Sequence, residues 1–445
     1  MHTLYSSLRA AVSMLLLSTL LVLASCSSDD AELLEQVPAS AGAVIVTDLS
    51  QLMDDAGYTD NPSTMPGWLT AGILGNADRA AKAVDLSHIV SFSMPGSGFV
   101  TIVRLKDDSE FAALVSEAGM TESEQSGFTL WSGNGTSVAV KNHQAWIAPD
   151  AVEMARKAAA RCADDGKFTL WKGLTEFLST RSTLGIVVAV EPAGADQQGR
   201  YAAIDIEGNQ EAASVTACQM RADGEKYTNS SLTTLQTDFL RYLPRNFNAA
   251  FAMGVGPDFD WSSVAQVVES FGGGRARGFF DVVATVLSQC NGTLAIAADA
   301  YSLPGNEPAV LAMVHMTQEK VDSVQRDIIA QFATLGIKAT QRADGQYMIP
   351  VPGMKVFVGN VDGYLAFGTQ PFVTDGASPF TTTFEGQLAA AAVQMETLRT
   401  YSLAIPYGLD LSAKVGDTDT RVRIAFPGST DRPLANILSL MSFLF

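Results

Sequence analysis

Few side chains in this sequence have the types and spacing that catalysis requires. After residue 25 the only histidines are His88, His143 and His315, and none lies at i, i+4 spacing from another. No His-Glu-x-x-His, Cys-x-x-Cys or Gly-x-Ser-x-Gly pattern occurs, so the sequence signatures of zinc sites and nucleophile elbows are missing. The sequence therefore predicts no catalytic residue, no metal site and no cofactor.

Two weaker patterns suggest ligand binding. Residues 271–278 combine four glycines with two arginines, which could bind an anion through backbone N–H groups and charge. This segment lacks the Lys-Ser/Thr ending of a phosphate loop and lies between two predicted helices, so an interhelical turn is favoured. Asp258 and Asp260, like Asp417 and Asp419, offer carboxylates without the full ligand set of a calcium loop, so we expect turn and capping roles.

The first 26 residues carry the most specific pattern. Arg9 precedes an apolar run of eleven residues, 14–24, which is too short to span a bilayer and is typical of a secretory signal. The following Leu23-Ala24-Ser25-Cys26 resembles the lipobox of bacterial lipoproteins, whose cysteine is acylated after cleavage. We therefore predict that residues 1–25 are a signal peptide and that Cys26 is lipidated.

Residues 26–36 are predicted to form a lipidated, acidic tether. Several acyl chains on Cys26 would anchor the chain stably, because each buried CH2 contributes about 0.8 kcal/mol and one chain alone is marginal. Residues 27–32, Ser-Ser-Asp-Asp-Ala-Glu, resemble the acidic export signal of surface lipoproteins of the Bacteroidetes, and they also fit a solvated linker. The chain should then be anchored to the bacterial outer membrane, with exposure at the cell surface as one option.

Three cysteines remain once Cys26 is acylated, namely Cys162, Cys218 and Cys290. An exported chain can form disulfides, and Cys162 with Cys218 is the favoured pair because both lie in the first half of the sequence. Their apolar neighbours favour small, unpaired core residues instead.

Composition describes a large acidic globule. The chain has 445 residues, of which 47% are hydrophobic and 17% charged, enough apolar material for a core and for two or more domains. Its net charge of -18 becomes -19 without residues 1–25, which carry Arg9 and no acid. This charge opposes binding to nucleic acid.

The sequence after residue 36 contains two similar halves, 37–242 and 243–445. Val37-Pro38 and Leu243-Pro244 each precede a short turn and a predicted strand. Further strands follow in the same order, many joined by hairpin turns. They are predicted at 89–94, 99–105, 128–131, 137–141, 144–147, 184–191, 201–207 and 213–221, and at 293–300, 309–316, 346–351, 355–358, 364–368, 401–411 and 420–426.

Helices are predicted from Asp start signals, amphipathic spacing and glycine stops. They cover 48–56, 67–83, 108–118, 151–163, 170–180 and 231–242 in the first half, and 260–271, 276–289, 318–334, 384–399 and 433–444 in the second. The helix at 151–163 has no counterpart, since residues 371–379 read as a loop. The pattern predicts an α+β fold with two tandem halves, each a largely antiparallel sheet with packed helices.

The aromatic residues Trp131 and Trp146, with Phe128, come from neighbouring predicted strands and could form a platform for a sugar or peptide. The second half has Met348 and Leu365 at roughly corresponding places. Apolar residues in both halves indicate a shared inward face, so core packing is the favoured interpretation.

The lipobox, the acidic tether and the opening Val37-Pro38 with Ala43-Val44-Ile45-Val46 and Asp48-Leu49 together resemble an uncharacterised family of Bacteroidetes lipoproteins. The similarity extends over nearly the whole chain, through loose proline, strand and helix patterns. It implies an envelope location and no established activity.

These observations favour a membrane-anchored, non-enzymatic envelope lipoprotein that binds a partner protein or a glycan. A carboxylate-dependent hydrolase of cell-surface polymers is the alternative, because two carboxyl groups can hydrolyse glycosides without histidine. A purely structural role in the envelope is the third hypothesis.

Overall fold

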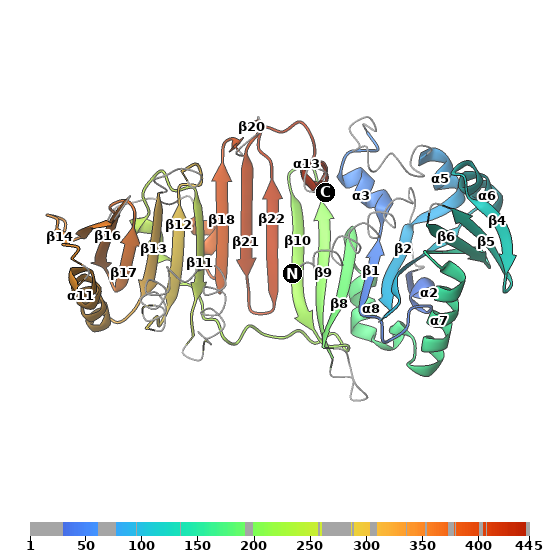
Figure 1. Cartoon of the computed structure of the whole chain (residues 1–445), viewed down its shortest axis with the longest axis horizontal. Helices are drawn as coiled ribbons and strands as arrows, with labels where there is room; N and C mark the ends of the chain where they lie inside the picture. Colours follow the sequence, from blue (N-terminus) through green and yellow to red (C-terminus); the bar gives the residue numbers. More distant parts are fainter. Residues whose placement is uncertain are drawn as a thin grey trace. The chain divides into compact units, whose positions relative to one another are not determined.

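The computed structural model of the chain forms two compact units (Figure 1), unit 1 comprising residues 1–227 with 430–445 and unit 2 comprising residues 228–429. The structure describes residues 30–60, 77–94, 96–133, 135–191, 199–256, 259, 286, 289–302, 309–334, 336–351, 354–372, 378, 380–399, 404–405 and 407–441.

The described strands of unit 1 pair antiparallel into a sheet. The order is β4 (Thr121–Gln125), β5 (Phe128–Gly133), β6 (Thr136–Lys141), β7 (Gln144–Ala148), β3 (Gly98–Leu105), β2 (Val84–Met94), β1 (Ala43–Thr47), β8 (Leu184–Glu191), β9 (Arg200–Gly208) and β10 (Ala213–Met220).

The helices of unit 1 begin where the sequence places short polar caps. The Asp48 side chain accepts from the Gln51 N–H at 2.9 Å and starts α3 (Leu49–Asp55), while Asp107 and Asp150 cap α6 (Asp108–Glu117) and α7 (Ala151–Asp164). These helices confirm the predictions at 48–56, 108–118 and 151–163. The other helices among the described residues of unit 1 are α2 (Asp30–Leu34), α5 (Ala77–Ala83), η3 (Phe168–Leu170), α8 (Lys172–Ser179) and α13 (Pro433–Met441).

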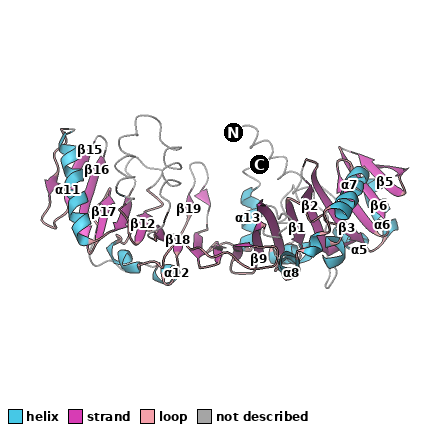
Figure 2. Cartoon of the chain, turned by 90° about the horizontal axis from the view of Figure 1, so that it is seen from below, coloured by secondary structure: helices cyan, strands magenta, loops and turns pink. Residues whose placement is uncertain are grey.

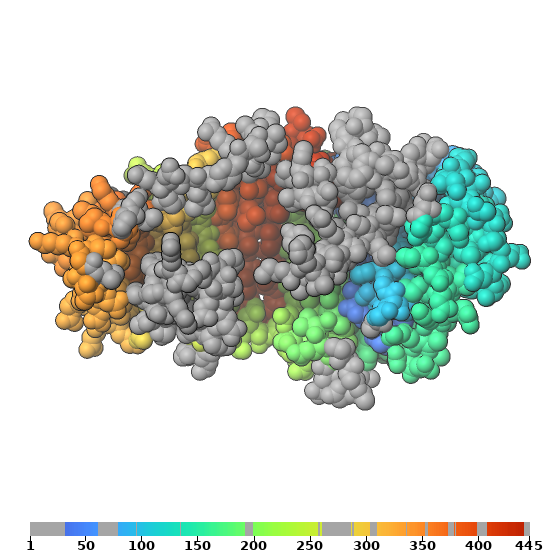
Figure 3. All heavy atoms as spheres, viewed as in Figure 1, coloured from blue at the N-terminus to red at the C-terminus, as the bar shows by residue number. Residues whose placement is uncertain are grey.

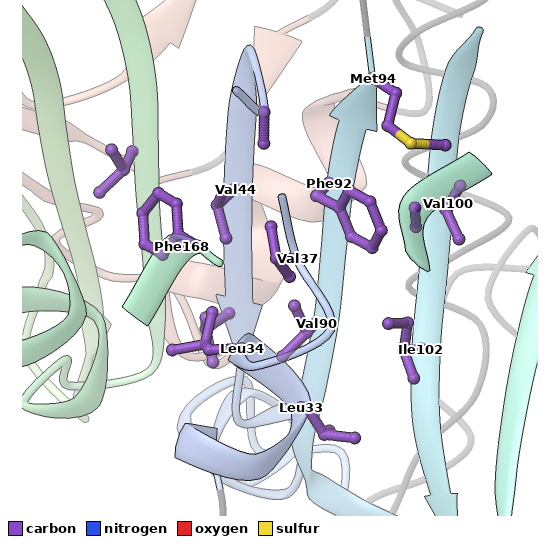
Figure 4. Close-up of a cluster of buried hydrophobic side chains, with 14 of the residues drawn as sticks. Leu33, Leu34, Val37, Val44, Val90, Phe92, Met94, Val100, Ile102 and Phe168 are labelled. Atoms are coloured by element: carbon purple, nitrogen blue, oxygen red, sulfur yellow. The ribbon is translucent and has the colours of Figure 1, made fainter. Parts of the chain in front are cut away.

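Each face of the unit 1 sheet has its own hydrophobic core. Figure 4 shows part of the first core, in which Leu33, Leu34 and Val37 pack against Val44 and Phe92. The second core lies under α3, α5, α6 and α13. Along the central strands β2 and β3, side chains alternate between the two cores because the pleat has a period of two residues.

Ten of the described strands of unit 2 also pair antiparallel. The order is β14 (Thr340–Gln341), β15 (Tyr347–Val351), β16 (Met354–Val361), β17 (Tyr364–Gly368), β13 (Val310–His315), β12 (Thr293–Ala298), β11 (Ala249–Gly254), β18 (Ala389–Met395), β21 (Leu409–Val415) and β22 (Asp419–Ala425). Strands β19 (Leu398–Arg399) and β20 (Ala404–Ile405) form a separate pair.

The helices of unit 2 are η4 (Thr237–Tyr242), α11 (Gln318–Thr334) and α12 (Thr381–Phe384) among the described residues. Figure 2 shows α11 alongside β16 and β17 and α12 beside β18, in agreement with their contacts. Phe239 of η4 and Phe384 of α12 pack edge to face at 5.8 Å in one core, and Val321 of α11 lies in the other.

Matched in chain order, the ten strands of unit 2 follow the same sheet order as the ten strands of unit 1. The registers also match, since Ala43 pairs with Ser93 and Val188, and Ala249 pairs with Ala298 and Val393. The predicted α+β class with antiparallel sheets is confirmed.

The predicted helix at 384–399 is wrong. Residues 389–395 form β18, between β11 and β21, and only Thr381–Phe384 is helical before it. The alanine run favours a helix locally, yet pairing on both sides outweighs a propensity of well under 1 kcal/mol per residue. The predicted helix at 231–242 is likewise reduced to the 3-10 turn η4.

The C-terminal helix confirms its predicted type, but it belongs to the other unit. Leu434 and Ala435 of α13 pack with Leu49 and Met53, and the Arg432 guanidinium bonds to the Asp54 carbonyl. The units therefore divide at 227/228, with the chain returning to unit 1 at residue 430, whereas the predicted boundary was 242/243. Amphipathic spacing identifies an apolar helix face but not the core that it covers.

The predicted tether at 26–36 is shorter than expected. Helix α2 begins at Asp30, and Leu33, Leu34 and Val37 are fully buried in the first core. Complete burial of one leucine contributes about 1.5–3 kcal/mol. Residues 30–36 are therefore part of the globular unit.

Candidate functional site

Several predicted features lie outside the described residues. They are Cys26 with the rest of 1–29, the glycine-rich segment 271–278, Asp258 and Asp260, and the predicted helix at 260–271. Among the described residues, no helix is long and apolar enough to cross a membrane.

The tryptophans are core residues, as the favoured interpretation predicted. Trp146 packs edge to face on Phe92, with ring centroids 6.3 Å apart, in the first core of unit 1, whereas Trp131 lies in the second. The two rings therefore face opposite sides of the sheet and form no joint platform. By strand register they correspond to Ala366 and Tyr347, one residue away from the predicted Leu365 and Met348, and such a slip reverses the face.

None of the three described cysteines forms a disulfide. Cys218 and Cys290 are buried and Cys162 is half-buried, with its Sγ 3.5 Å from the Gln36 carbonyl oxygen. Burial raises the pKa of the Cys162 and Cys290 thiols above the ordinary value. Cys162 and Cys218 form no disulfide.

The acidic candidates among the described residues serve turns and ion pairs. Asp419 pairs with Arg421 at 3.1 Å, and the Asp417 carbonyl accepts from the Asn229 N–H. Asp205 and Glu207 of β9 both accept from the Ser182 hydroxyl, at 3.0 and 3.3 Å. Within the described ranges no three His, Cys, Asp or Glu side chains are placed to hold a metal ion.

Among the described residues, His88 and His143 share no side-chain partner that would support catalysis. His88 is buried within β2. His143 lies at the tip of the β6–β7 hairpin, where its Nδ1 is 3.0 Å from an Asp108 carboxylate oxygen and its side chain is 78% exposed. Asn142 and His143 both have positive φ, which the two-residue turn requires.

His315 lies in a group of titratable side chains in unit 2, which we call the His315 cluster: His315, Tyr364, Asp238, Tyr242 and Asp362. His315 ends β13 and pairs with Tyr364, which begins β17, and their rings meet edge to face at 5.1 Å. The Tyr242 hydroxyl donates to Asp362 in the β16–β17 turn. Helix η4 supplies Asp238 and Tyr242.

Hydrogen bonds hold the hydroxyls of Tyr364 and Tyr242, and burial keeps both phenols uncharged. The Tyr364 hydroxyl donates to the Gln236 carbonyl at 3.3 Å, and the Arg241 Nε donates to the Tyr242 hydroxyl at 2.8 Å. Desolvation raises the pKa of both phenols, so both stay protonated at neutral pH.

Burial lowers the pKa of His315, against smaller opposing effects of the Asn291 backbone and the Asp238 charge. The ring is therefore neutral at pH 7, and its buried Nδ1 has no hydrogen-bond partner. Gly292 leaves room for the His315 ring, because a Cβ at residue 292 would lie 2.7 Å from the His315 Nδ1. A neutral imidazole beside the protonated Tyr364 phenol can accept or donate hydrogen bonds. The nearby Cys290 thiol bonds to the Gly292 carbonyl, and burial raises its pKa, so it is held as a thiol rather than as a thiolate nucleophile.

Unit 1 has a different polar group at the corresponding position. Arg104 pairs across β3 and β7 with Gln144, and both side chains bond to the Glu32 carboxylate. Glu32 lies six residues before Pro38, as Asp238 lies six residues before Pro244. The His315 cluster thus stands where unit 1 has a permanent ion pair. Aligning the two halves of the sequence on Pro38 and Pro244 could have identified the His315 cluster, whereas the position of His315 alone could not.

No family model and no curated protein matches the chain. Solved structures that match are three crystal forms of TP0453: form IV (12% identity, TM-score 0.26, 42% of this chain and 79% of that chain), form III (12%, 0.27, 44% and 80%) and form I (9%, 0.27, 44% and 80%). Similarity at these TM-scores carries no functional argument.

Proposed function

We propose that this chain is an outer-membrane lipoprotein, anchored through Cys26, that arose by duplication of one α+β unit and binds a partner protein without catalysis. The leader and lipobox support the anchor. The observation that carries the proposal is an exposed apolar sheet face, which is present in each unit.

Duplication is supported by the match between the two sheets, which extends to both cores. Val44, Val90 and Phe92 of the first unit 1 core correspond by register to Ala250, Ala295 and Ala297, which lie in one unit 2 core. On the other side of the sheets, Ile89, Val103 and Val138 correspond to Leu294, Val314 and Val358. Two unrelated sheets would have no reason to share order, register and burial.

The unit 1 apolar face is formed by the last three strands of that unit. Ile186 pairs with Ile204, and Ile204 pairs with Ala217, so all three lie on one side. Val188 continues this side on β8 and is 37% exposed. Val190, which is 48% exposed, follows at the register shift between Ala189 and Glu191. The opposite side of the same strands is buried through Val187, Ala203 and Cys218.

The unit 2 apolar face lies on the corresponding side of its sheet. Phe251 and Ile296 pair directly and are 41% and 45% exposed, and Ala391 and Ala413 continue the row. The described strands β21 and β22 contribute surface that is visible in red in Figure 3. At the matching places in unit 1, Ile45 and Ser91 are buried.

Exposed aliphatic side chains on a sheet face favour a protein partner over a glycan. Grouped apolar side chains at a surface are a mark of protein interfaces, because covering them removes apolar area from water. Glycan sites commonly present aromatic rings, and the described tryptophans, Trp131, Trp146 and Trp171, are buried in the cores. The hydrolase hypothesis gains nothing from Asp205 and Glu207, whose oxygens bond to Ser182.

The anchor is tested by metabolic labelling with a fatty-acid probe. The wild-type chain should incorporate the probe and float with membranes, Cys26→Ala should lose both properties, and the neighbouring control Ser27→Ala should keep both. Labelling that survives Cys26→Ala would refute the lipid assignment.

Binding is tested by photo-crosslinking in intact cells from an aromatic crosslinker placed at 188 or 190. A discrete protein adduct should form from these positions. A crosslinker at Glu207, which is exposed on the other side of the same sheet, is the matched control. Equal adducts from all three positions, or none from 188 and 190, would refute binding through this face.

A further inference from the structure

We infer that the Arg104 end of unit 1 faces the membrane directly, with lipid headgroups as the surface that it meets. This inference rests on the proposed lipidation of Cys26. It follows from the length of chain between the anchor and the first docked element, together with the contacts that hold that element in place.

The connection between anchor and unit is very short. Only Ser27, Ser28 and Asp29 separate Cys26 from the first residue of α2. Four residue steps span at most about 14 Å even when fully extended. An acylated Cys26 lies at the boundary of headgroups and acyl chains, so α2 must lie within about that distance of the bilayer.

Helix α2 cannot move away from the unit to lengthen this connection without breaking its contacts. Leu33 and Leu34 are fully buried in the first core. The Glu32 carboxylate accepts from Arg104 and from Gln144, at 2.5 and 3.3 Å. The Gln36 amide donates to the Gln144 Oε1 at 2.5 Å.

These contacts place α2 at one end of the unit 1 strands. Arg104 is near the end of β3, and the Leu105 N–H donates to the His143 carbonyl at 2.7 Å in the adjacent hairpin turn. The other end of β3 begins at Gly98, after the turn that contains Ser97. The two ends are about 23 Å apart, at about 3.3 Å per residue, which exceeds the reach of the connection. The Arg104 end is therefore the end held against the bilayer.

Energy transfer to labelled lipid measures this orientation. The full lipidated chain, with Cys162→Ser to remove the half-buried thiol, is reconstituted into phosphatidylcholine vesicles whose headgroups carry an acceptor dye. Donor dyes are attached in separate variants at His143→Cys and at Ser97→Cys. Asp108→Cys, exposed beside His143, is a second near position should the turn variant misfold, and Glu191→Cys is a second far position.

Transfer from the near positions should exceed transfer from the far positions at least twofold. Insertion of a twenty-residue Gly/Ser linker between Ser28 and Asp29 should abolish the difference, because such a linker adds a root-mean-square reach of about 25 Å. Vesicle flotation of each variant separates the two hypotheses. A chain that fails to float overturns the lipid anchor and this inference with it. A chain that floats with equal transfer from both ends, or with a difference that survives the linker, overturns the orientation alone.

Discussion

Corresponding positions at the end of β3 in unit 1 and of β13 in unit 2 carry different polar side chains. In unit 1, Arg104 bonds to Glu32 beside Gln144. In unit 2, His315 packs on Tyr364 and Asp238 acts on it only through its charge. The first arrangement is an ion pair, whereas the second has aromatic packing and a histidine ring whose pKa is lowered by burial. Equivalent backbone positions therefore do not imply equivalent sites.

The largest expected difference in stability between the units comes from the residue that pairs with His315 or with Arg104, namely Tyr364 in unit 2 and Gln144 in unit 1. Tyr364 is fully buried, whereas Gln144 is only partly buried. Tyr364→Ala should destabilise unit 2 by about 3–5 kcal/mol, as deletion of a large buried aromatic does, and Gln144→Ala should cost unit 1 about 1 kcal/mol. Hydrogen exchange of β13 and β17 against β3 and β7 reads the units separately. Equal losses of protection would contradict the comparison.

The second expected difference is pH dependence in unit 2. Since the folded state lowers the pKa of His315 below 6.5, the unfolded state binds more protons as the pH falls through that value. The contribution of His315 to stability is complete above pH 6.5 and decreases below it, towards the folded-state pKa.

Hydrogen exchange of β13 at pH 7.5 and 5.5 measures this effect. His315→Gln removes the titrating ring and should flatten the difference between the two pH values, whereas the exposed control His143→Gln should leave it unchanged. A dependence that persists in His315→Gln would assign it to another group.

Sequence reasoning was most successful where the signal is local. Asp48, predicted as a helix start signal, accepts from the Gln51 N–H at the start of α3. Asp107 and Asp150 cap α6 and α7 in the same way, although neither was singled out from the sequence. Alternation along strands anticipated most of both sheets. These signals need no knowledge of which elements meet.

Long-range features were the ones that the sequence did not predict. The alanines of β18 favour a helix until two neighbouring strands are known. Helix α13 follows unit 2 along the chain, yet it packs with Leu49 of unit 1. The His315 cluster joins η4, β13 and the β16–β17 turn, so no single window of sequence contains it.

A smaller effect is expected at the ion pair of unit 1. Glu32→Gln removes the charge that faces Arg104, while the amide can still accept a hydrogen bond, so the loss should be about 0.2–1 kcal/mol, the range of exposed pairs. Glu35→Gln, which removes the pair with Lys167 at 3.1 Å, is the matched control on the same segment. Hydrogen exchange of the α2 amides measures both. Raising the salt concentration should narrow the difference between wild type and Glu32→Gln, because screening weakens the pair.

The smallest stability effect is expected on the unit 2 apolar face. Ile296 occupies the place of the buried Ser91 but is 45% exposed, so Ile296→Ser should change stability by no more than about 0.5 kcal/mol. The reverse change, Ser91→Ile, introduces bulk where Ser91 bonds to Thr101 at 2.8 Å, and should cost about 1–3 kcal/mol. Thermal unfolding with hydrogen exchange distinguishes the two. A large loss from Ile296→Ser would mean that this side chain supports the fold, and would remove it from the proposed binding face.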